Sequence, residues 1–204
     1  MGRKSDSRQH LIDAANELIW GRSYGAVTIE VICERAGVKK GSFYYFFDSK
    51  SDLAVASIHA WWAERKALVD QLFQPGVPPL DRVTKYIDFA IQNQIEVYEK
   101  TGRVLGCPVF TLGSEIFSQD DRILSVIQEV LSTGTRLFEQ AIREAQARGE
   151  VAKGDAALKG RFLWAFYEGS LTRARIENNL DLIRNLSAEA MELIGACPKL
   201  AAVA

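Results

Sequence analysis

Apolar residues recur at intervals of three and four along most of the chain, as one face of an α-helix requires, and no convincing alternating strand pattern occurs. The first such run predicts a helix that ends near Gly21. Its apolar face holds Leu11, Ile12, Ala15, Leu18 and Ile19. Because the same period continues toward the C-terminus, we expect an all-α protein.

Two short helices follow the first one. Thr28 is a good N-cap for the second helix, and Gly37, which tolerates left-handed backbone geometry, ends it. The apolar face of this helix holds Ile29, Ile32, Cys33 and Ala36. A third helix is expected over roughly residues 40–47. Two short helices joined by a glycine turn form a helix-turn-helix, which places its second helix in the DNA major groove.

Longer helices make up the rest of the chain. A fourth helix, capped by Asp48 or Ser49, is expected over about residues 50–73, and the proline-rich run over 75–79 breaks it. Five more are expected near residues 80–100, 108–117, 120–148, 155–178 and 181–195. We therefore predict about nine helices, with a helix-turn-helix DNA-binding domain over residues 1–49 and a helical body over residues 50–204.

The penultimate helix carries a face suited to packing against another helix. Its members alternate at intervals of four and three, and they are Leu158, Phe162, Ala165, Gly169, Thr172 and Ile176. We expect this face to pair with its two-fold mate in a second copy of the chain, with Gly169 permitting a close crossing. The last helix is expected to complete a four-helix bundle through Ile183, Ala190 and Ile194.

Composition and charge narrow the class of protein. The 204 residues are 48% hydrophobic and 25% charged, as in an ordinary globular protein. No run of about 18 apolar residues occurs, so we expect no membrane partner and a cytoplasmic location. Residues 1–50 hold eight Lys/Arg and six Asp/Glu, whereas residues 51–204 hold 17 and 20. A weakly basic head on an acidic body suits a DNA-binding protein with a separate sensing domain.

Residues that carry catalysis or bind metals are scarce. The three cysteines are far apart and without CxxC spacing, which argues against a disulfide framework and a structural zinc site. Neither of the two histidines has a metal-binding spacing, and no Walker loop or GxGxxG motif follows a strand-like run. We expect no metal, no cofactor and no enzymatic activity.

An aromatic and basic cluster lies in the third helix. Phe43 and Phe47, four residues apart, are expected to face inward, while Tyr44 and Tyr45 present hydroxyls and ring faces to DNA phosphates, sugars and thymine methyls. Further candidate DNA contacts near these rings are residues that are small or carry a positive charge. They are Thr28, Lys39, Lys40, Gly41, Ser42 and Lys50.

The candidate contacts have different expected roles. We expect Lys40 and Ser42 to contact bases, and Thr28, Tyr44 and Lys50 to hold phosphates, Lys50 from the N-terminus of the fourth helix. Lys39 adds charge at the entry to the third helix. Gly41, which has no side chain, lets the backbone approach the duplex closely.

The segment from Leu11 to Leu53 closely resembles the DNA-binding head of the TetR/AcrR family of bacterial transcriptional regulators. The matching residues are Ala14-Ala15, Leu18-Ile19, Gly25-Ala26-Val27-Thr28-Ile29, Ile32, Ala36-Gly37-Val38, Gly41-Ser42-Phe43-Tyr44-Tyr45-Phe46-Phe47 and Lys50-Ser51-Asp52-Leu53. Phe46 departs from the family pattern, which often has a polar residue there. In the body, Tyr167-Glu168-Gly169-Ser170-Leu171 resembles the family's penultimate, dimer-forming helix.

The resemblance implies that residues 50–204 form an effector-binding and dimerisation domain, with an effector cavity between the fourth helix and the bundle that follows. Candidate members are rings and two other side chains of the body: Trp61, Trp62, Phe89, Cys107, Phe110, Phe117, Phe138, Trp164, Tyr167 and Glu168. Arg103 and Glu115 are further polar candidates, although each also suits a surface charge or an ion pair. Most of these rings are equally suited to the core.

We therefore expect a homodimeric repressor that an unidentified small-molecule effector releases from double-stranded operator DNA. One alternative is a regulator that senses electrophiles or oxidants through Cys107, near a helix N-terminus where thiolate is favoured. A second alternative is a small-molecule-binding protein or enzyme with a vestigial helix-turn-helix. Intact Thr28, Lys40, Tyr44 and Lys50, together with the shortage of catalytic residues, argue against this second alternative.

Overall fold

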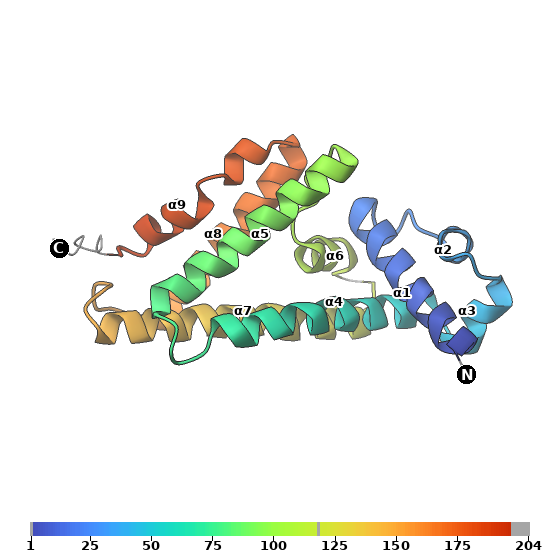
Figure 1. Cartoon of the computed structure of the whole chain (residues 1–204), viewed down its shortest axis with the longest axis horizontal. Helices are drawn as coiled ribbons and strands as arrows, with labels where there is room; N and C mark the ends of the chain where they lie inside the picture. The colour runs from blue at the N-terminus through green and yellow to red at the C-terminus, as the bar shows by residue number, and fades with distance from the viewer. Residues whose placement is uncertain (1, 118, 197–204) are drawn as a thin grey trace. The chain divides into compact units, whose positions relative to one another are not determined.

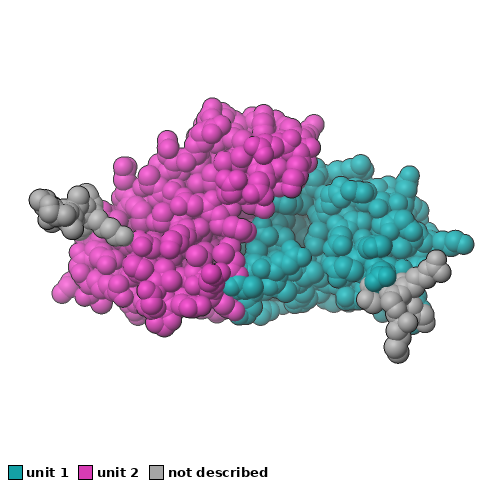
Figure 2. Space-filling view, in the orientation of Figure 1, with its two compact units in different colours: residues 1–67, 108–131 teal, residues 68–107, 132–204 magenta. Residues whose placement is uncertain are grey.

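The computed structural model describes residues 2–117 and 119–196, and α-helices make up most of both compact units of the chain (Figure 1). Unit 1 comprises residues 1–67 and 108–131, and unit 2 comprises residues 68–107 and 132–204 (Figure 2). Among the described residues, an isolated antiparallel bridge between Val151 and Ala196 is the one β-type pairing. The all-α prediction is confirmed. In this part of the chain no helix has both the length and the apolar content to cross a membrane.

Three helices form the N-terminal part of unit 1: α1 (Gly2–Gly21), α2 (Ile29–Ala36) and α3 (Lys40–Phe46). Thr28 caps α2, since its Oγ1 accepts a hydrogen bond of 3.3 Å from the N–H of Val31. Gly37 ends α2 in the left-handed region at φ 67°. Apolar side chains from all three helices enclose a core in which Leu11, Ala15, Ile32 and Phe43 are fully buried. The expected cap, stop and short third helix are therefore present.

The rest of unit 1 comes from α4, α6 and α7. α4 (Lys50–Leu72) begins after Ser49, whose Oγ accepts a hydrogen bond of 3.1 Å from the N–H of Asp52. α6 (Pro108–Ile116) packs against α1, and α7 (Asp121–Ala147) contributes its first eleven residues to this unit. Compactness thus groups α6 and the start of α7 with the first three helices. The functional boundary at residue 49 stays a prediction.

Unit 2 contains α5 (Pro79–Thr101), α8 (Ala156–Glu177), the 3-10 helix η1 (Leu180–Ile183), α9 (Leu186–Leu193) and the remaining part of α7. α5, α8, η1 and α9 pack side by side (Figure 1). The single helix predicted over residues 181–195 is wrong, because a 3-10 turn and a short α-helix occupy that stretch. Asn185 lies at the junction with non-helical backbone angles.

An ion pair that the sequence did not suggest lies at the base of unit 2. The Arg82 side chain is 1% exposed, and its guanidinium lies 2.9 Å from Oε2 of Glu144 on α7. It also donates a 2.8 Å hydrogen bond to the carbonyl oxygen of Val77. The Arg82 side chain thereby links the proline-rich segment before α5 to α7.

Candidate nucleic-acid interface

The side chains expected to meet DNA lie on the outer face of the helix-turn-helix. Tyr44 and Tyr45 on α3 are 52% and 65% exposed, whereas Phe43 and Phe47 are buried with their ring centroids 6.0 Å apart. The division into inward phenylalanines and outward tyrosines is confirmed. The remaining candidates at this face are exposed or half-buried, and they are Thr28, Lys39, Lys40, Gly41 and Ser42.

Lys40 has an internal partner on α2. Its Nζ lies 2.5 Å from Oε1 of Glu30, and both side chains are exposed. The Lys40 ammonium lowers the pKa of Glu30 to about 2 through this hydrogen bond, and Glu30 in turn raises the pKa of Lys40. To contact a base through the same donor, Lys40 must therefore exchange a carboxylate for the base edge. Lys39 is exposed beside it.

Lys50 is half-buried and has partners within its own chain. Its Nζ donates hydrogen bonds to the carbonyl oxygens of Tyr24 at 2.8 Å and of Val27 at 3.0 Å, and it lies 4.0 Å from the centroid of the Tyr24 ring. Burial lowers the pKa of Lys50. Lys50 thus ties α4 to the turn that follows α1, and its contact with a phosphate stays a prediction.

Gly41 is a glycine that the fold itself does not require. A Cβ built at Gly41 meets no atom within 4 Å, and the residue lies within α3. Gly37 also has open space, but its φ of +67° favours glycine. Nothing in the fold therefore requires glycine at position 41, and its lack of a side chain allows the close approach of DNA to α3 that we expect.

Two side chains, one on α6 and one on α7, bind segments of unit 1 that lie much earlier in the sequence. The Glu115 carboxylate accepts backbone hydrogen bonds from Tyr24 at 2.9 Å and Gly25 at 2.7 Å. Arg122 pairs with Asp52 at 2.7 Å and donates to Oγ of Ser51 at 3.1 Å. Glu115 is therefore an anchor of the α1–α2 turn and not the effector ligand that we considered.

The ten residues assigned to an effector cavity divide between the units. Trp61, Trp62, Phe110 and Phe117 belong to unit 1, and the other six belong to unit 2. Phe117 is 73% exposed and Phe89 is 39% exposed, so neither ring forms an enclosed wall within its own unit, and their assignment is corrected.

An aromatic cluster holds three of the six residues in unit 2. Phe138, Trp164 and Tyr167 surround Tyr86 of α5, with ring centroids 5.5, 6.0 and 5.8 Å from it. Phe138 is 1% exposed and Tyr167 is 5% exposed. These rings pack against one another as part of the unit's core, and sequence reasoning missed Tyr86 at their centre.

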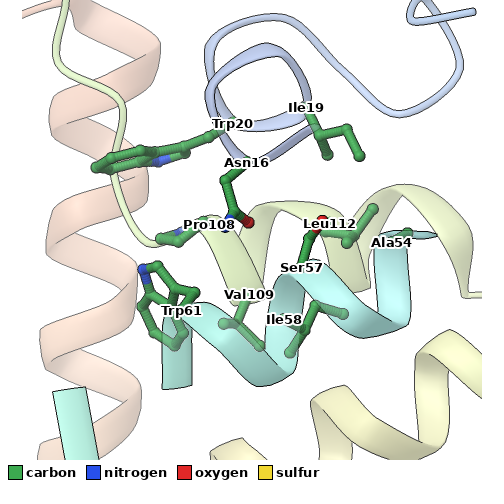
Figure 3. Close-up of a pocket in the computed structure, with 10 residues that line it drawn as sticks. All are labelled: Asn16, Ile19, Trp20, Ala54, Ser57, Ile58, Trp61, Pro108, Val109 and Leu112. Atoms are coloured by element: carbon green, nitrogen blue, oxygen red, sulfur yellow. The ribbon is translucent and has the colours of Figure 1, made fainter. Parts of the chain in front are cut away.

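Trp61 lines a small pocket within unit 1, with an accessible volume of about 30 Å³ (Figure 3). The other lining residues come from α1, α4 and α6: Asn16, Ile19, Trp20, Ala54, Ser57, Ile58, Pro108, Val109 and Leu112. The Trp61 ring stacks on Trp62 at 6.3 Å. Its Nε1 is buried and has no hydrogen-bond partner among the described residues.

Buried Glu168 and half-buried Cys107 form a pair in unit 2. The Cys107 side chain hydrogen-bonds to the Glu168 carboxyl, whose other oxygen, Oε2, is buried without a partner in the described part of the chain. Burial raises the pKa of Glu168 to about 8. At neutral pH this carboxyl is therefore largely protonated.

The outer face of α8 is open in the single chain. Leu158, Phe162 and Ile176 are 38%, 60% and 78% exposed, and a Cβ at Gly169 meets nothing within 4 Å. By contrast, a Cβ at Gly160 on the same helix lies 2.9 Å from the backbone of Glu139.

Three residues expected at the dimer interface lie elsewhere. Ile183 and Ala190 are fully buried and Ile194 is 3% exposed, all within the core of unit 2. Their assignment to the interface is wrong, because α5 and α8 of the same chain already cover them.

Known proteins match both parts of this architecture. Residues 11–56, which include the helix-turn-helix, match the model of the bacterial regulatory proteins of the tetR family. Residues 79–190 match the tetracyclin repressor-like C-terminal domain. The chain belongs to the TetR family. Its helix-turn-helix is thus the DNA-binding part of a transcriptional regulator.

Relatives of this TetR-family chain match over most of their length. The transcriptional regulator AcuR of Cereibacter sphaeroides is 32% identical over 183 residues, covering 89% of this chain and 82% of AcuR. The transcriptional repressor NemR of Escherichia coli K12 is 23% identical over 191 residues, covering 93% and 94%. The crystal structure of a regulatory protein TetR from Rhodobacter sphaeroides has a TM-score of 0.81 at 32% identity, covering 92% and 98%.

Proposed function

We propose that this TetR-family regulator is a homodimeric repressor that binds a pseudo-palindromic operator and leaves it when a small molecule binds. The observation that carries the proposal is the face of α3, where two exposed tyrosines, two lysines and an unconstrained glycine stand side by side. Exposed tyrosine rings are unfavourable in water, and phosphate, sugar and thymine methyl groups match their chemistry. Binding to chromosomal DNA accords with a cytoplasmic location.

Dimerisation is supported by the open face of α8. Three large apolar side chains at exposures of 38% to 78% and an unobstructed Gly169 form a strip that one chain leaves uncovered. A second copy related by a two-fold axis covers this strip with the same strip. Two heads about 34 Å apart, one helical turn of DNA, then reach successive major grooves.

Release by an effector requires that the effector site and the operator-binding site be thermodynamically linked. A ligand that weakens operator binding tenfold must itself bind the operator complex tenfold more weakly, a coupling of about 1.4 kcal/mol. Two relatives of this chain, NemR of E. coli and DhaR of a Mycobacterium species, are transcriptional repressors, which supports this direction of control.

The test is selection of bound sequences from random duplexes, followed by sedimentation of the complex. We expect one enriched sequence with two-fold symmetry and two chains bound to each site. Enrichment of no sequence, or one chain bound to an asymmetric site, would overturn the proposal.

A second candidate function is sensing of electrophiles through Cys107. Cys107 directly precedes the first residue of α6, Pro108, and its thiol hydrogen-bonds to the Glu168 carboxyl, which can accept the thiol proton once it is ionised, above its pKa of about 8. The test compares alkylation by iodoacetamide in the wild type and in Glu168→Gln. Slower alkylation of the variant at Cys107 supports the candidate, whereas equal rates leave Glu168 without a role in activating the thiol.

A further inference from the structure

We propose that Glu30 and Lys40 read a G·C base pair in each half of the operator as one unit. In this arrangement Lys40 donates to guanine, and Glu30 accepts a hydrogen bond from the amino group of the paired cytosine. The inference rests on the proposed function and deepens it, because it names bases that the operator must carry.

Glu30 and Lys40 connect the first turns of the two helices of the helix-turn-helix. Glu30 is the second residue of α2, and Lys40 is the first residue of α3. Lys40 Nζ lies 2.5 Å from Oε1 of Glu30, while the Lys40 and Glu30 side chains remain 55% and 62% exposed. The hydroxyl of Thr28, the N-cap of α2, donates a second hydrogen bond to the Glu30 carboxylate. Two donors thus hold this carboxylate beside the first residue of α3.

The pair keeps hydrogen-bonding capacity for a partner outside the chain. An ammonium group has three N–H donors, and the two oxygens of a carboxylate offer about four acceptor positions. One donor of Lys40 is directed to Glu30, and two acceptor positions of Glu30 are taken by Lys40 and Thr28. Lys40 can therefore contact a base through its remaining donors without leaving Glu30, and Glu30 can accept a further hydrogen bond at the same time.

The edge of a G·C pair in the major groove complements this pair of side chains. Guanine presents the acceptors N7 and O6, and cytosine presents its N4 amino donor. Because O6 and N4 hydrogen-bond to each other, an acceptor and a donor lie side by side in this base pair. Lys40 Nζ and Glu30 Oε1, a donor and an acceptor, are likewise at hydrogen-bond distance. Guanine N7 adds a second acceptor on the side of the lysine.

The other base pairs fit the two side chains less well. The reversed pairs, C·G and A·T, place an amino donor against the lysine and an oxygen acceptor against the carboxylate. A T·A pair offers O4 and N6 in the favourable order. However, it also puts the thymine methyl group beside the lysine and adenine N7, an acceptor that repels a carboxylate, beside Glu30. The G·C orientation is therefore preferred over all three.

The negative charge of Glu30 supports a contact with a base. Phosphates repel a carboxylate that lies beside the DNA-binding helix, so Glu30 weakens binding to every sequence in which no donor compensates for it. In the major groove, the amino groups of cytosine and adenine are the donors that bases supply. Lys40 without Glu30 would accept either purine through N7, whereas the pair also requires an amino group in a defined place. Glu30 thus exchanges general affinity for discrimination.

The first experiment selects bound sequences from random duplexes with the full chain and two variants. Glu30→Ala removes the carboxylate, and Glu34→Ala removes another exposed carboxylate from the same helix. We expect the wild type and Glu34→Ala to select the same operator. Glu30→Ala should select an operator with a relaxed base pair at symmetry-related positions of the two halves, where the wild type requires G·C.

The second experiment removes the cytosine amino group itself. Pyrimidin-2-one, which lacks the 4-amino group, replaces cytosine at the relaxed position, and operator affinity is measured for the wild type and Glu30→Ala. Because the change in duplex stability is common to both proteins, it cancels in the comparison. We expect the replacement to weaken binding at least about fivefold more in the wild type than in Glu30→Ala.

Two results would overturn the inference and leave the proposed function intact. They are selection of an identical operator by the wild type and Glu30→Ala, and an equal effect of pyrimidin-2-one on both proteins. A wild type that enriches no sequence would contradict the proposed function itself, and this inference with it.

Discussion

Oε1 of Glu115 accepts a hydrogen bond of 2.7 Å from the backbone N–H of Gly25, ninety residues earlier in the chain. With the second bond to Tyr24, one carboxylate of α6 satisfies two N–H groups of the turn between α1 and α2. This turn leads directly into Thr28 and α2. Glu115 thus adds two hydrogen bonds to the packing of α1 on α6.

Glu115→Gln should loosen this turn. The amide retains one acceptor oxygen and loses the negative charge, so we expect unfolding to become easier by about 1–3 kcal/mol and operator affinity to fall. Hydrogen exchange at the Tyr24 and Gly25 amides should accelerate. Ser114→Ala is the control, because the Ser114 hydroxyl bonds only within α6, to Phe110. Unchanged exchange at both amides would show that Glu115 does not hold the turn.

Lys39 and Lys50 should respond differently to removal of their charge. Lys39→Ala removes an exposed charge beside α3, which should reduce the slope of log affinity against log salt by roughly 0.9 without changing stability. Lys50→Met leaves the carbonyl oxygens of Tyr24 and Val27 without their donor, so it should lower the free energy of unfolding by about 1–3 kcal/mol. Urea unfolding and operator titrations over a range of salt separate the two effects. A stable Lys50→Met protein with a reduced salt slope would instead show that Lys50 contacts a phosphate.

Gly169→Leu should separate dimers without unfolding the chain. A Cβ there meets no atom of its own chain within 4 Å, whereas a leucine side chain would obstruct the close crossing of two α8 helices. Analytical ultracentrifugation should show a dimer for the wild type and for Gly169→Ala, and a folded monomer for Gly169→Leu. A wild-type monomer, or a dimer of unchanged affinity in Gly169→Leu, would contradict the proposed interface.

Glu168 should make stability depend on pH. Its pKa rises from an ordinary value of 4.5 to about 8 on folding, because burial disfavours the charged form. Between these pH values the folded chain keeps a proton that the unfolded chain releases, so stability is highest below pH 4.5 and falls as pH rises to about 8. The difference is on the order of a few kcal/mol.

Urea unfolding at several pH values checks this expectation. Glu168→Gln should remove that part of the pH dependence, whereas Glu177→Gln, at the exposed end of the same helix, should preserve it. A wild-type profile identical to that of Glu168→Gln would show that Glu168 titrates normally in the folded protein.

Local features of the fold could be predicted because they depend on residues close in sequence. Thr28 caps the start of α2 and Gly37 caps its end, each through contacts with residues close in sequence. Phe43 and Phe47 both face inward because residues four apart lie on the same side of a helix. Helical period identifies such faces regardless of the tertiary structure.

Long-range partners could not be predicted in the same way. Lys50 is a cation at a helix N-terminus, and the sequence does not show that carbonyl oxygens 23 and 26 residues earlier already bind it. Likewise, the sequence of an apolar helix face does not show whether the same chain or a second chain covers that face. Ile183 and Ala190 are covered by their own chain, whereas Phe162 and Ile176 are left open.

Recognition of DNA by α3 is tested most sharply by Gly41→Ala, because the fold leaves room for this methyl group. We expect the variant to unfold at equal or up to ~1 kcal/mol higher free energy, since alanine favours the helix. Its affinity for the selected operator should fall at least tenfold, because the Cβ would lie between α3 and the duplex. Wild-type affinity for the operator in this variant would contradict a close approach of α3 to DNA.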